Sequence, residues 1–282
     1  MKIIESIRAM QDWSEAERHA GRRVVLVPTM GFLHEGHLIL VREGRRRGDR
    51  LVVSIFVNPT QFAPHEDYAA YPRDLERDRE LLEREGVDLL FRPAAEEIYP
   101  KGYQTYVEVE RLGQPLCGAF RPGHFRGVAT VVAKLFNIIQ PHVAIFGLKD
   151  YQQLQIIRRM ARELNFGVEV VGHPTVREKD GLAMSSRNSY LGTKERTAAL
   201  GLYRSLKKAE ALVREGERDG RRIVRAVKAE LESEPLARIE YVQICDPESL
   251  GEVEEIRGAA LLALAIRIGK ARLIDNAILQ VS

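Results

Sequence analysis

Three observations in the sequence predict an α/β fold built on a doubly wound parallel sheet, with a smaller α+β domain after it. First, the runs Val24–Val27, Leu51–Val57 and His142–Phe146 are almost entirely apolar, as are strands buried on both faces of a parallel sheet. Second, segments with the apolar spacing of helices separate these runs, which gives the strand–helix alternation of a Rossmann-like sheet. Third, beyond Asn188 two charged amphipathic helices come before the strands, an order typical of a separate α+β unit.

The expected helices and strands follow along the chain. Apolar spacing predicts helices at residues 5–19, 37–47, 75–85, 123–140, 151–165, 194–216 and 219–232. Apolar or alternating runs predict strands at residues 24–27, 51–57, 88–91, 105–109, 142–146, 167–171, 238–245, 260–268 and 274–279. We expect Pro28 to end the pairing of the first strand, because it has no N–H to give to a sheet. The change of pattern predicts two domains, residues 1–175 and 176–282.

The composition is that of a globular protein. The chain has 282 residues, of which 45% are hydrophobic and 29% charged, with a formal net charge of +3. The small charge and the lack of a basic or aromatic RNA-binding module argue against a nucleic-acid partner. Cys117 and Cys245 form no disulfide framework or metal spacing. The charged N-terminus is no signal peptide and the apolar run Ala259–Ile266 is too short to span a bilayer, so we expect a cytoplasmic protein without membrane contact.

The loop after the first buried strand is the leading candidate for a site. It reads Pro-Thr-Met-Gly-Phe-Leu-His-Glu-Gly-His and leads into a predicted helix, whereas G-x-G-x-x-G and Walker A patterns are absent. A helix N-terminus favours an anion, and His34 and His37 can both donate to a phosphate when protonated. Two alternatives stay open: ordinary surface histidines, or two ligands of a zinc site without nearby cysteines to complete it.

Polar side chains follow two further strands. Asn58 and Gln61 come directly after the second buried strand, at the carboxyl edge where open α/β sheets bind ligands. The alternative for this pair is that it only caps the turn. Lys149 stands beside a glycine at a helix start, where it can reach a phosphate, and Gln153 lies one turn further on the same face. The alternative for Lys149 is an ordinary surface lysine.

A polar loop at residues 175–188 carries consecutive hydroxyls and two arginines. Ser185, Ser186 and Arg187 can clamp phosphate oxygens through O–H and guanidinium donors. Small residues on both sides of Met184 indicate that a ligand approaches the backbone closely. The alternative is a plain surface loop.

Four motifs, taken together and in order, resemble the pantoate–β-alanine ligase family over essentially the whole chain. They are Pro-Thr-Met-Gly with His-x-Gly-His, Asn-Pro-x-Gln, Gly-x-Lys-Asp-Tyr-Gln-Gln and Met-Ser-Ser-Arg-Asn. His-x-Gly-His alone is shared with a wider superfamily of adenylyl-transferring enzymes. The resemblance implies that ATP and (R)-pantoate form pantoyl adenylate with release of pyrophosphate. It further implies that β-alanine then displaces AMP to give pantothenate.

The resemblance also implies residue roles, matched motif by motif. Catalytic roles fall to His37, His34, Lys149, Ser185, Ser186 and Arg187. ATP contacts fall to Met30, Gly31, Phe32, Leu33, His34, Glu35, Gly36, His37, Gly147, Leu148, Lys149, Asp150, Val176, Met184, Ser185, Ser186 and Arg187. Pantoate contacts fall to Gln61, Gln153, Pro28, Thr29, Met30 and Asn58, and β-alanine contacts to Gln61 and Tyr71. Leu148 departs from the family, which often has Glu there, but no group assigned to the chemistry is lost.

The chemistry agrees with these roles. A carboxylate that attacks the α-phosphorus brings two negative charges together, so catalysis rests on neutralisation and alignment by cationic and hydroxyl side chains and by Mg²⁺. Mg²⁺ needs few protein ligands when phosphates and water supply the rest, so no residue is assigned to it. The sequence offers no general base for the amine of β-alanine. We expect a closing loop that keeps the adenylate dry, with the segment after Phe62 as candidate, and the family implies a homodimer.

Two other functions compete with this interpretation. A nucleotidyltransferase acting on a phosphorylated metabolite would share the His-x-Gly-His corner. It would need basic groups around its phosphorylated substrate. The sequence instead offers the amides of Gln61 and Gln153 there, with Pro28, Met30 and Phe62 as apolar walls, and this combination favours a small hydroxy acid. A non-catalytic nucleotide sensor or RNA-binding relative is the second alternative. Turnover of ATP without a protein or RNA partner separates an enzyme from that class.

Overall fold

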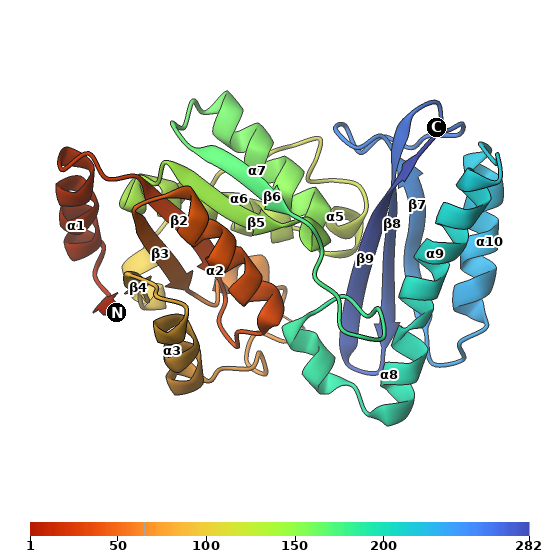
Figure 1. The fold of residues 1–282 in the computed structure, drawn as a ribbon, viewed down its shortest axis with the longest axis horizontal. Helices are drawn as coiled ribbons and strands as arrows, with labels where there is room; N and C mark the ends of the chain where they lie inside the picture. Colours follow the sequence, from red (N-terminus) through yellow and green to blue (C-terminus); the bar gives the residue numbers. More distant parts are fainter. Residues whose placement is uncertain (65, 282) are drawn as a thin grey trace. The chain divides into compact units, whose positions relative to one another are not determined.

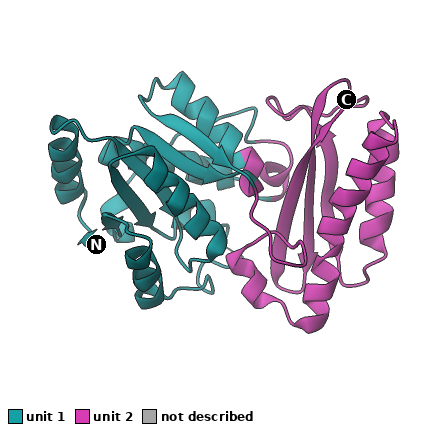
Figure 2. Cartoon of the chain, in the orientation of Figure 1, with its two compact units in different colours: residues 1–113, 121–148, 153–174 teal, residues 114–120, 149–152, 175–282 magenta. Residues whose placement is uncertain are grey.

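The computed structural model describes residues 1–64 and 66–281, and its chain divides into two compact units (Figure 2). Unit 1 comprises residues 1–113, 121–148 and 153–174, and unit 2 comprises residues 114–120, 149–152 and 175–282. Two short segments that come before residue 175 therefore belong to unit 2.

Unit 1 is built on a six-stranded sheet whose neighbouring strands are all parallel. The order is β1 (Lys2–Ile4), β4 (Leu89–Phe91), β3 (Arg50–Ile55), β2 (Val24–Thr29), β5 (Val143–Gly147) and β6 (Glu169–His173). The predicted parallel α/β fold is confirmed. From β2 the chain moves outward to β3 and β4, then returns to β5 on the other side of β2. Open α/β sheets bind ligands outside the carboxyl ends of their strands at such a reversal.

Helices connect the strands of unit 1 (Figure 1). They are α1 (Ile7–His19), α2 (Glu35–Arg47), α3 (Leu75–Arg84), the short α4 (Ala95–Ile98), α6 (His124–Ile139) and α7 (Tyr151–Glu163). Helix α2 packs on β2, β3 and β5. Gly44 makes this contact close, since a Cβ there would lie 2.7 Å from Leu51 Cδ1 and 3.3 Å from Val27 Cγ2. The last turns of α2 thereby lie close against β2 and β3.

Unit 2 holds a three-stranded antiparallel sheet, which confirms the predicted α+β part. Its order is β7 (Arg238–Cys245), β8 (Ala259–Ile268) and β9 (Ala271–Gln280). The helical elements are α5 (Cys117–Phe120), η3 (Ser186–Tyr190), α8 (Thr193–Ala199), α9 (Gly201–Arg214) and α10 (Gly220–Glu232). Helices α9 and α10 pack on each other and on the sheet (Figure 1). No helix in the described parts of either unit is long and apolar enough to cross a membrane.

Strand β2 continues through Pro28, so the expectation that Pro28 ends the pairing is wrong. On the β3 side the pairing runs on to Thr29, whose carbonyl oxygen accepts from Phe56 N at 3.1 Å. On the other side the pairing with β5 stops at Leu26. Main-chain groups of successive residues in a strand point to opposite neighbours. The N–H that Pro28 lacks therefore faces the side on which pairing has already ended.

Three other expectations need correction. Residues 105–109 form no strand, because Val107 N donates to Thr130 Oγ1 on α6 at 2.9 Å instead of to a neighbouring strand. The helix predicted at residues 194–216 is two helices, α8 and α9, with the weak helix former Gly201 at the joint. The sequence pattern does not predict β1, since three residues are too few for an alternation to show.

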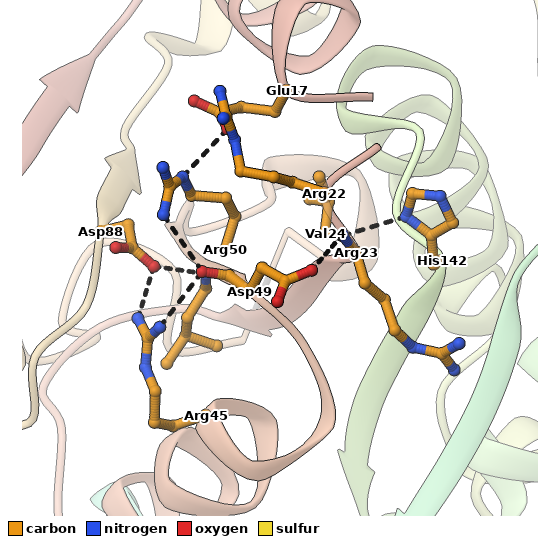
Figure 3. A network of polar contacts seen from close by, with 10 residues as sticks. Glu17, Arg22, Arg23, Val24, Arg45, Asp49, Arg50, Asp88 and His142 are labelled. Carbon is orange, nitrogen blue, oxygen red and sulfur yellow. Dashed lines mark hydrogen bonds and ion pairs between the residues drawn. The ribbon is translucent and has the colours of Figure 1, made fainter. Parts of the chain in front are cut away.

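Ion pairs fasten the amino ends of the central strands of unit 1 (Figure 3). The Glu17 carboxylate pairs with Arg22 and Arg50, and Arg45 pairs with Asp88. Burial opposes the ionisation of Glu17, but the two guanidinium groups outweigh it and lower the pKa of Glu17. The amino edge of the sheet is thus occupied by its own side chains, and the carboxyl edge is the one that a ligand can use.

Candidate active site

The loop between β2 and α2 places two histidines at the start of a helix. His34 is the N-cap of α2, with extended backbone, and His37 lies in its first turn. His34 N donates to His37 Nδ1 at 3.3 Å, and the two ring centroids are 4.0 Å apart. A neutral His37 ring therefore carries its proton on Nε2, from which it can donate to a ligand. The pair lies where the helix dipole best stabilises an anion.

Asp78 on α3 holds the loop that leads to these histidines. The carboxylate accepts from Phe32 N and Leu33 N, both at 2.7 Å, and Asp78 is 1% exposed. Gly31 and Phe32 have φ values of 82° and 48°, in the left-handed region that a residue such as Phe avoids. Burial raises the pKa of the Asp78 carboxyl, and the two N–H groups oppose this rise. These bonds help to hold Phe32 in its unfavourable conformation just before His34.

The turn after β3 presents Gln61. This turn, η1 (residues 59–61), follows Asn58, which is 1% exposed. Asn58 Nδ2 donates to Gln61 Oε1 at 3.1 Å and to Gly127 O at 3.0 Å. Gln61 Nε2 lies 3.2 Å from Met30 Sδ. The Asn58 amide is thus used in internal bonds and holds the Gln61 side chain beside the β2–α2 loop.

Helix α6 and the turn just before it support η1. A Cβ on Gly127 would lie 2.4 Å from Thr60 O and 2.7 Å from Gln61 N. Glycine at this position therefore lets α6 and η1 approach closely. Arg121 Nη2 and His124 Nδ1 also contact Gln61 O, at 3.2 and 2.9 Å. The backbone of Gln61 is consequently fixed to the start of α6.

A buried ion pair fastens Arg121 in turn. Arg121 Nε and Nη2 donate to Glu66 Oε1 and Oε2, each at 2.7 Å, and the two side chains are 10% and 11% exposed. Burial opposes the ionisation of Glu66, but the Arg121 guanidinium outweighs it and lowers the pKa of Glu66 to about 2. The pair joins the segment after η1 to the turn just before α6. This segment is the candidate closing loop, a role that stays a prediction.

In unit 2, Lys149 and Asp150 lie in the short turn η2 (Leu148–Asp150). The carbonyl oxygen of Lys149 accepts from Asn276 Nδ2 on β9 at 2.8 Å. Gln152 Oε1 accepts from Cys117 N at 3.0 Å. The bond from Asn276 acts on the main chain of the turn and restricts where the Lys149 side chain begins, whereas the bond of Gln152 ties the start of α7 to Cys117.

The loop at residues 176–188 is closed on itself within unit 2. Met184 N donates to Val176 O at 2.9 Å. Ser185 caps η3, since its Oγ accepts from Arg187 N at 3.3 Å, and Ser186 is 8% exposed. A hydroxyl that accepts can still donate its own hydrogen. The Ser185 hydroxyl can therefore cap the turn and bind an anion at once.

The predicted site residues divide between the two units. Unit 1 holds Pro28, Thr29, Met30, Gly31, Phe32, Leu33, His34, Glu35, Gly36, His37, Asn58, Gln61, Tyr71, Gly147, Leu148 and Gln153. Unit 2 holds Lys149, Asp150, Val176, Met184, Ser185, Ser186 and Arg187. Contacts inside unit 1 join the histidines to each other and Gln61 to Met30 and Asn58. Contacts inside unit 2 join Val176 to Met184.

Several predicted residues have polar groups engaged inside the protein. Thr29 Oγ1 donates to Ser54 O at 2.9 Å, and Glu35 pairs with Arg42. Tyr71 is 6% exposed, with its ring against that of Phe62. Their ligand contacts stay predictions. Across residues 1–64 and 66–281 no group of three or more His, Cys, Asp or Glu could hold a metal ion, so the zinc alternative finds no third ligand there.

Sequence reasoning missed the supporting residues Asp78, Arg121, Gly127 and Asn276. Asp78 stands in a highly charged segment that resembles a solvated helix face. An isolated glycine inside a helical pattern, as at position 127, is a signal of close packing that could have been used. Asn276 stands within a strand and carries no signal of its own.

Comparisons with known proteins match one family along nearly the whole chain. The family model for pantoate–β-alanine ligase matches residues 2–278. A pantothenate synthetase of Syntrophotalea carbinolica is 58% identical over 276 residues, 98% of each chain. One of Heliobacterium modesticaldum is 58% identical over 281 residues, 100% of each chain.

Solved structures show the same relationship. A pantothenate synthetase from Thermus thermophilus has a TM-score of 0.93 at 48% identity, over 98% of this chain and 99% of that one. A pantoate–β-alanine ligase from Francisella tularensis, complexed with beta-gamma ATP and β-alanine, has a TM-score of 0.80 at 32% identity, over 99% and 97%. At this identity and coverage, the chain belongs to the pantoate–β-alanine ligase family.

Proposed function

We propose that the protein condenses (R)-pantoate with β-alanine to pantothenate, at the expense of ATP and through a pantoyl-adenylate intermediate. The observation that carries the proposal is the pair of neighbouring imidazoles at the start of α2, His34 at the N-cap and His37 in the first turn, in a chain that matches the ligase family over residues 2–278. The adjacent Gln61 has its amide beside Met30 Sδ. This combination of an anion site and a polar–apolar wall suits ATP together with a small hydroxy acid.

The first step transfers AMP to pantoate. A pantoate carboxylate oxygen attacks the α-phosphorus, the bond to the bridging oxygen breaks, and pyrophosphate leaves with the electron pair. His37 Nε2 and His34 lie at a helix start and stabilise the charge that builds on the phosphates. Lys149 contributes a point charge, and Ser185 and Arg187 contribute directed donors. Gln61 and Gln153 hold pantoate.

In the second step the amine nitrogen of β-alanine attacks the acyl carbon of the adenylate. The acyl carbon–oxygen bond breaks, AMP leaves, and the ammonium loses a proton to water. Orientation by Gln61 and Tyr71 suffices for this step, because the acyl group is already activated. Neither residue needs to act as a base.

Mg²⁺ belongs to the proposal as a partner of ATP. It would supply charge neutralisation on the phosphates when bound. The donor set of the described residues fits such a role only in part, since it contains no cluster of three or more potential ligands. Triphosphate oxygens and water would then provide most of the coordination, as Mg²⁺ prefers.

ATP–pyrophosphate exchange tests this proposal. With wild-type protein and Mg²⁺, exchange should require pantoate, and β-alanine should then yield AMP and pantothenate. His37→Ala and Lys149→Ala should each lower exchange roughly 100- to 1000-fold. Gln280→Ala, which removes an exposed amide near the end of β9, is the control and should leave exchange unchanged. Exchange only with a phosphorylated acceptor would favour a nucleotidyltransferase, and no exchange with either would favour a nucleotide sensor.

The homodimer, the cytoplasmic location and the division into domains 1–175 and 176–282 remain part of the proposal. Sedimentation velocity at micromolar concentration tests the homodimer. Limited proteolysis tests the boundary, because a linker between independent domains is cleaved first.

A further inference from the structure

We propose that two adjacent residues of β9, Asp275 and Asn276, form a positioning element for the adenylation step. Through their side chains, the turn of Lys149 and the loop at residues 176–188 are both hydrogen-bonded to strand β9. The inference rests on the proposed function, because it takes Lys149 and Arg187 as contacts of the ATP phosphates. Neither β9 residue belongs to the motifs that identify the family in the sequence.

Asn276 acts on the Lys149 turn. Its Nδ2 donates to Lys149 O at 2.8 Å, across 127 positions of sequence. The turn η2 has only three residues, so it offers few internal bonds that could fix its main chain. The bond from Asn276 sets the position from which the long Lys149 side chain extends. Only a side chain with an N–H or O–H donor can make this bond to a carbonyl oxygen.

Asp275 acts on the loop at residues 176–188. Arg177 Nη1 and Nη2 donate to Asp275 Oδ2 and Oδ1, at 2.7 and 2.9 Å. The Asp275 side chain is 0% exposed and that of Arg177 is 23% exposed. Arg177 Nη1 also donates to Gly181 O at 3.0 Å, inside the same loop. A bidentate pair of this kind is specific in direction as well as in charge, so it fixes the base of the loop that carries Arg187.

Strand β9 makes a rigid carrier for both contacts. Asp275 pairs with Leu264 and Asn276 with Ala263 in a continuous register with β8. Successive side chains of a strand point to opposite faces. Asp275 therefore faces the side of α9, where Tyr203 lies under the Arg177 guanidinium, and Asn276 faces the other side. Two segments far apart in the sequence thus depend on neighbouring residues of one paired strand.

The test uses the full-length protein and pantoate-dependent ATP–pyrophosphate exchange. Asn276→Ala removes the donor, and Asn276→Asp removes it at nearly constant size. Both should lower kcat of exchange roughly 10- to 100-fold, with KM for pantoate little changed, as expected of a misplaced catalytic group. Gln280→Ala removes an amide from the same face of the same strand and should leave exchange within twofold. Melting temperatures of all variants report on the fold.

Two readouts distinguish positioning from a merely structural role. In a double-mutant cycle, Asn276→Ala should have less than a twofold effect when Lys149 is already Ala, because the support then has nothing to position. The exchange rate of Asn276→Asp relative to wild type should rise as the pH is lowered, because a protonated carboxyl can again donate to Lys149 O. A structural role alone predicts neither result.

Independent effects of the two substitutions in the cycle, or wild-type exchange in both Asn276 variants, would overturn the inference. If Asn276→Ala fails to fold, the near-isosteric Asn276→Asp and its pH profile decide. Failure of the proposed function is distinguishable, because the wild-type protein itself would then show no pantoate-dependent exchange.

Discussion

Replacing Gly127 by Ala tests whether the position of Gln61 depends on helix α6. An alanine Cβ would lie 2.4 Å from Thr60 O, 2.6 Å from Thr60 C and 2.7 Å from Gln61 N. All three are main-chain atoms, so no side chain can turn aside. Ordinary van der Waals contact begins at 3.4 Å, so η1 must move by about 1 Å to make room for the new Cβ.

The effects on stability and on activity should separate. Overpacking costs about 1–3 kcal/mol, whereas alanine gains about 1 kcal/mol over glycine inside a helix. The net loss of stability is therefore at most about 2 kcal/mol, which corresponds to a fall in melting temperature of roughly 4–8 °C for a protein of this size. A shift of about 1 Å in a substrate-positioning group can cost on the order of 100-fold in rate. The displaced group here is Gln61.

Pantoate-dependent exchange and thermal unfolding should be measured on the same samples. We expect exchange by Gly127→Ala to fall about 100-fold at temperatures where the protein is folded, with a raised KM for pantoate. Gly167→Ala is the matched control in unit 1, because a Cβ there would meet nothing within 4 Å. The reasoning fails if Gly127→Ala retains exchange within twofold of wild type, or if its loss of activity only follows unfolding.

Three further predictions concern the supports of unit 1. Asp78→Asn replaces one acceptor by a donor that faces a main-chain N–H, so the free energy of unfolding measured in urea should fall by about 1–3 kcal/mol. Exchange should fall as well, and an unchanged urea melt would contradict the prediction. Glu66→Gln leaves the buried Arg121 cation without a carboxylate partner and should cost about 3–5 kcal/mol. The pKa of Glu66 lies at about 2, below its ordinary 4.5, so the stability that this pair contributes is complete above pH 4.5 and is lost toward pH 2. The melting temperatures of wild type and variant should therefore converge in acid, and a constant difference between them would refute this. Burial and neighbouring arginines lower the pKa of His142 below its ordinary 6.5, and neutral Nδ1 accepts from Val24 N at 3.0 Å. The stability that neutral His142 contributes is therefore complete above pH 6.5 and is lost as the pH falls below that value. The melting temperature of wild type should fall faster in acid than that of His142→Gln, and an equal decline of the two would count against this prediction.

The sequence predicts the fold well where one physical signal dominates. The buried strands of the parallel sheet are continuous apolar runs, so β2, β3 and β5 were predicted within a few residues of their observed bounds. Errors arise where tertiary contacts compete with a local rule. Pro28 stays in its strand because the pairing on its N–H side has already ended. Val107 leaves an alternating pattern because Thr130 supplies its hydrogen-bond partner.

For the candidate site too, some residues can be predicted from the sequence and others cannot. Residues proposed to face the ligands, such as His37, Lys149 and Arg187, stand in short motifs at strand ends and loops, where a polar residue has no packing reason to occur. Their positions make them candidates, and the resemblance to the ligase family is what implies their roles. The arrangement of the two units and the identity of the closing loop have no comparable signal, because they depend on contacts between distant segments.

The residues that hold the motifs in place escape sequence reasoning for a physical reason. Asp78 binds the N–H of Leu33 across 45 positions, the Gly127 carbonyl binds Asn58 across 69, and Asn276 binds Lys149 across 127. Two of these contacts reach a motif residue through its main chain, so the motif residue's side chain gives no hint of its partner. The same contacts decide geometry to within about 1 Å, the scale on which rate depends. Two chains with identical motifs can therefore differ widely in rate, and the difference should be sought first at these supports.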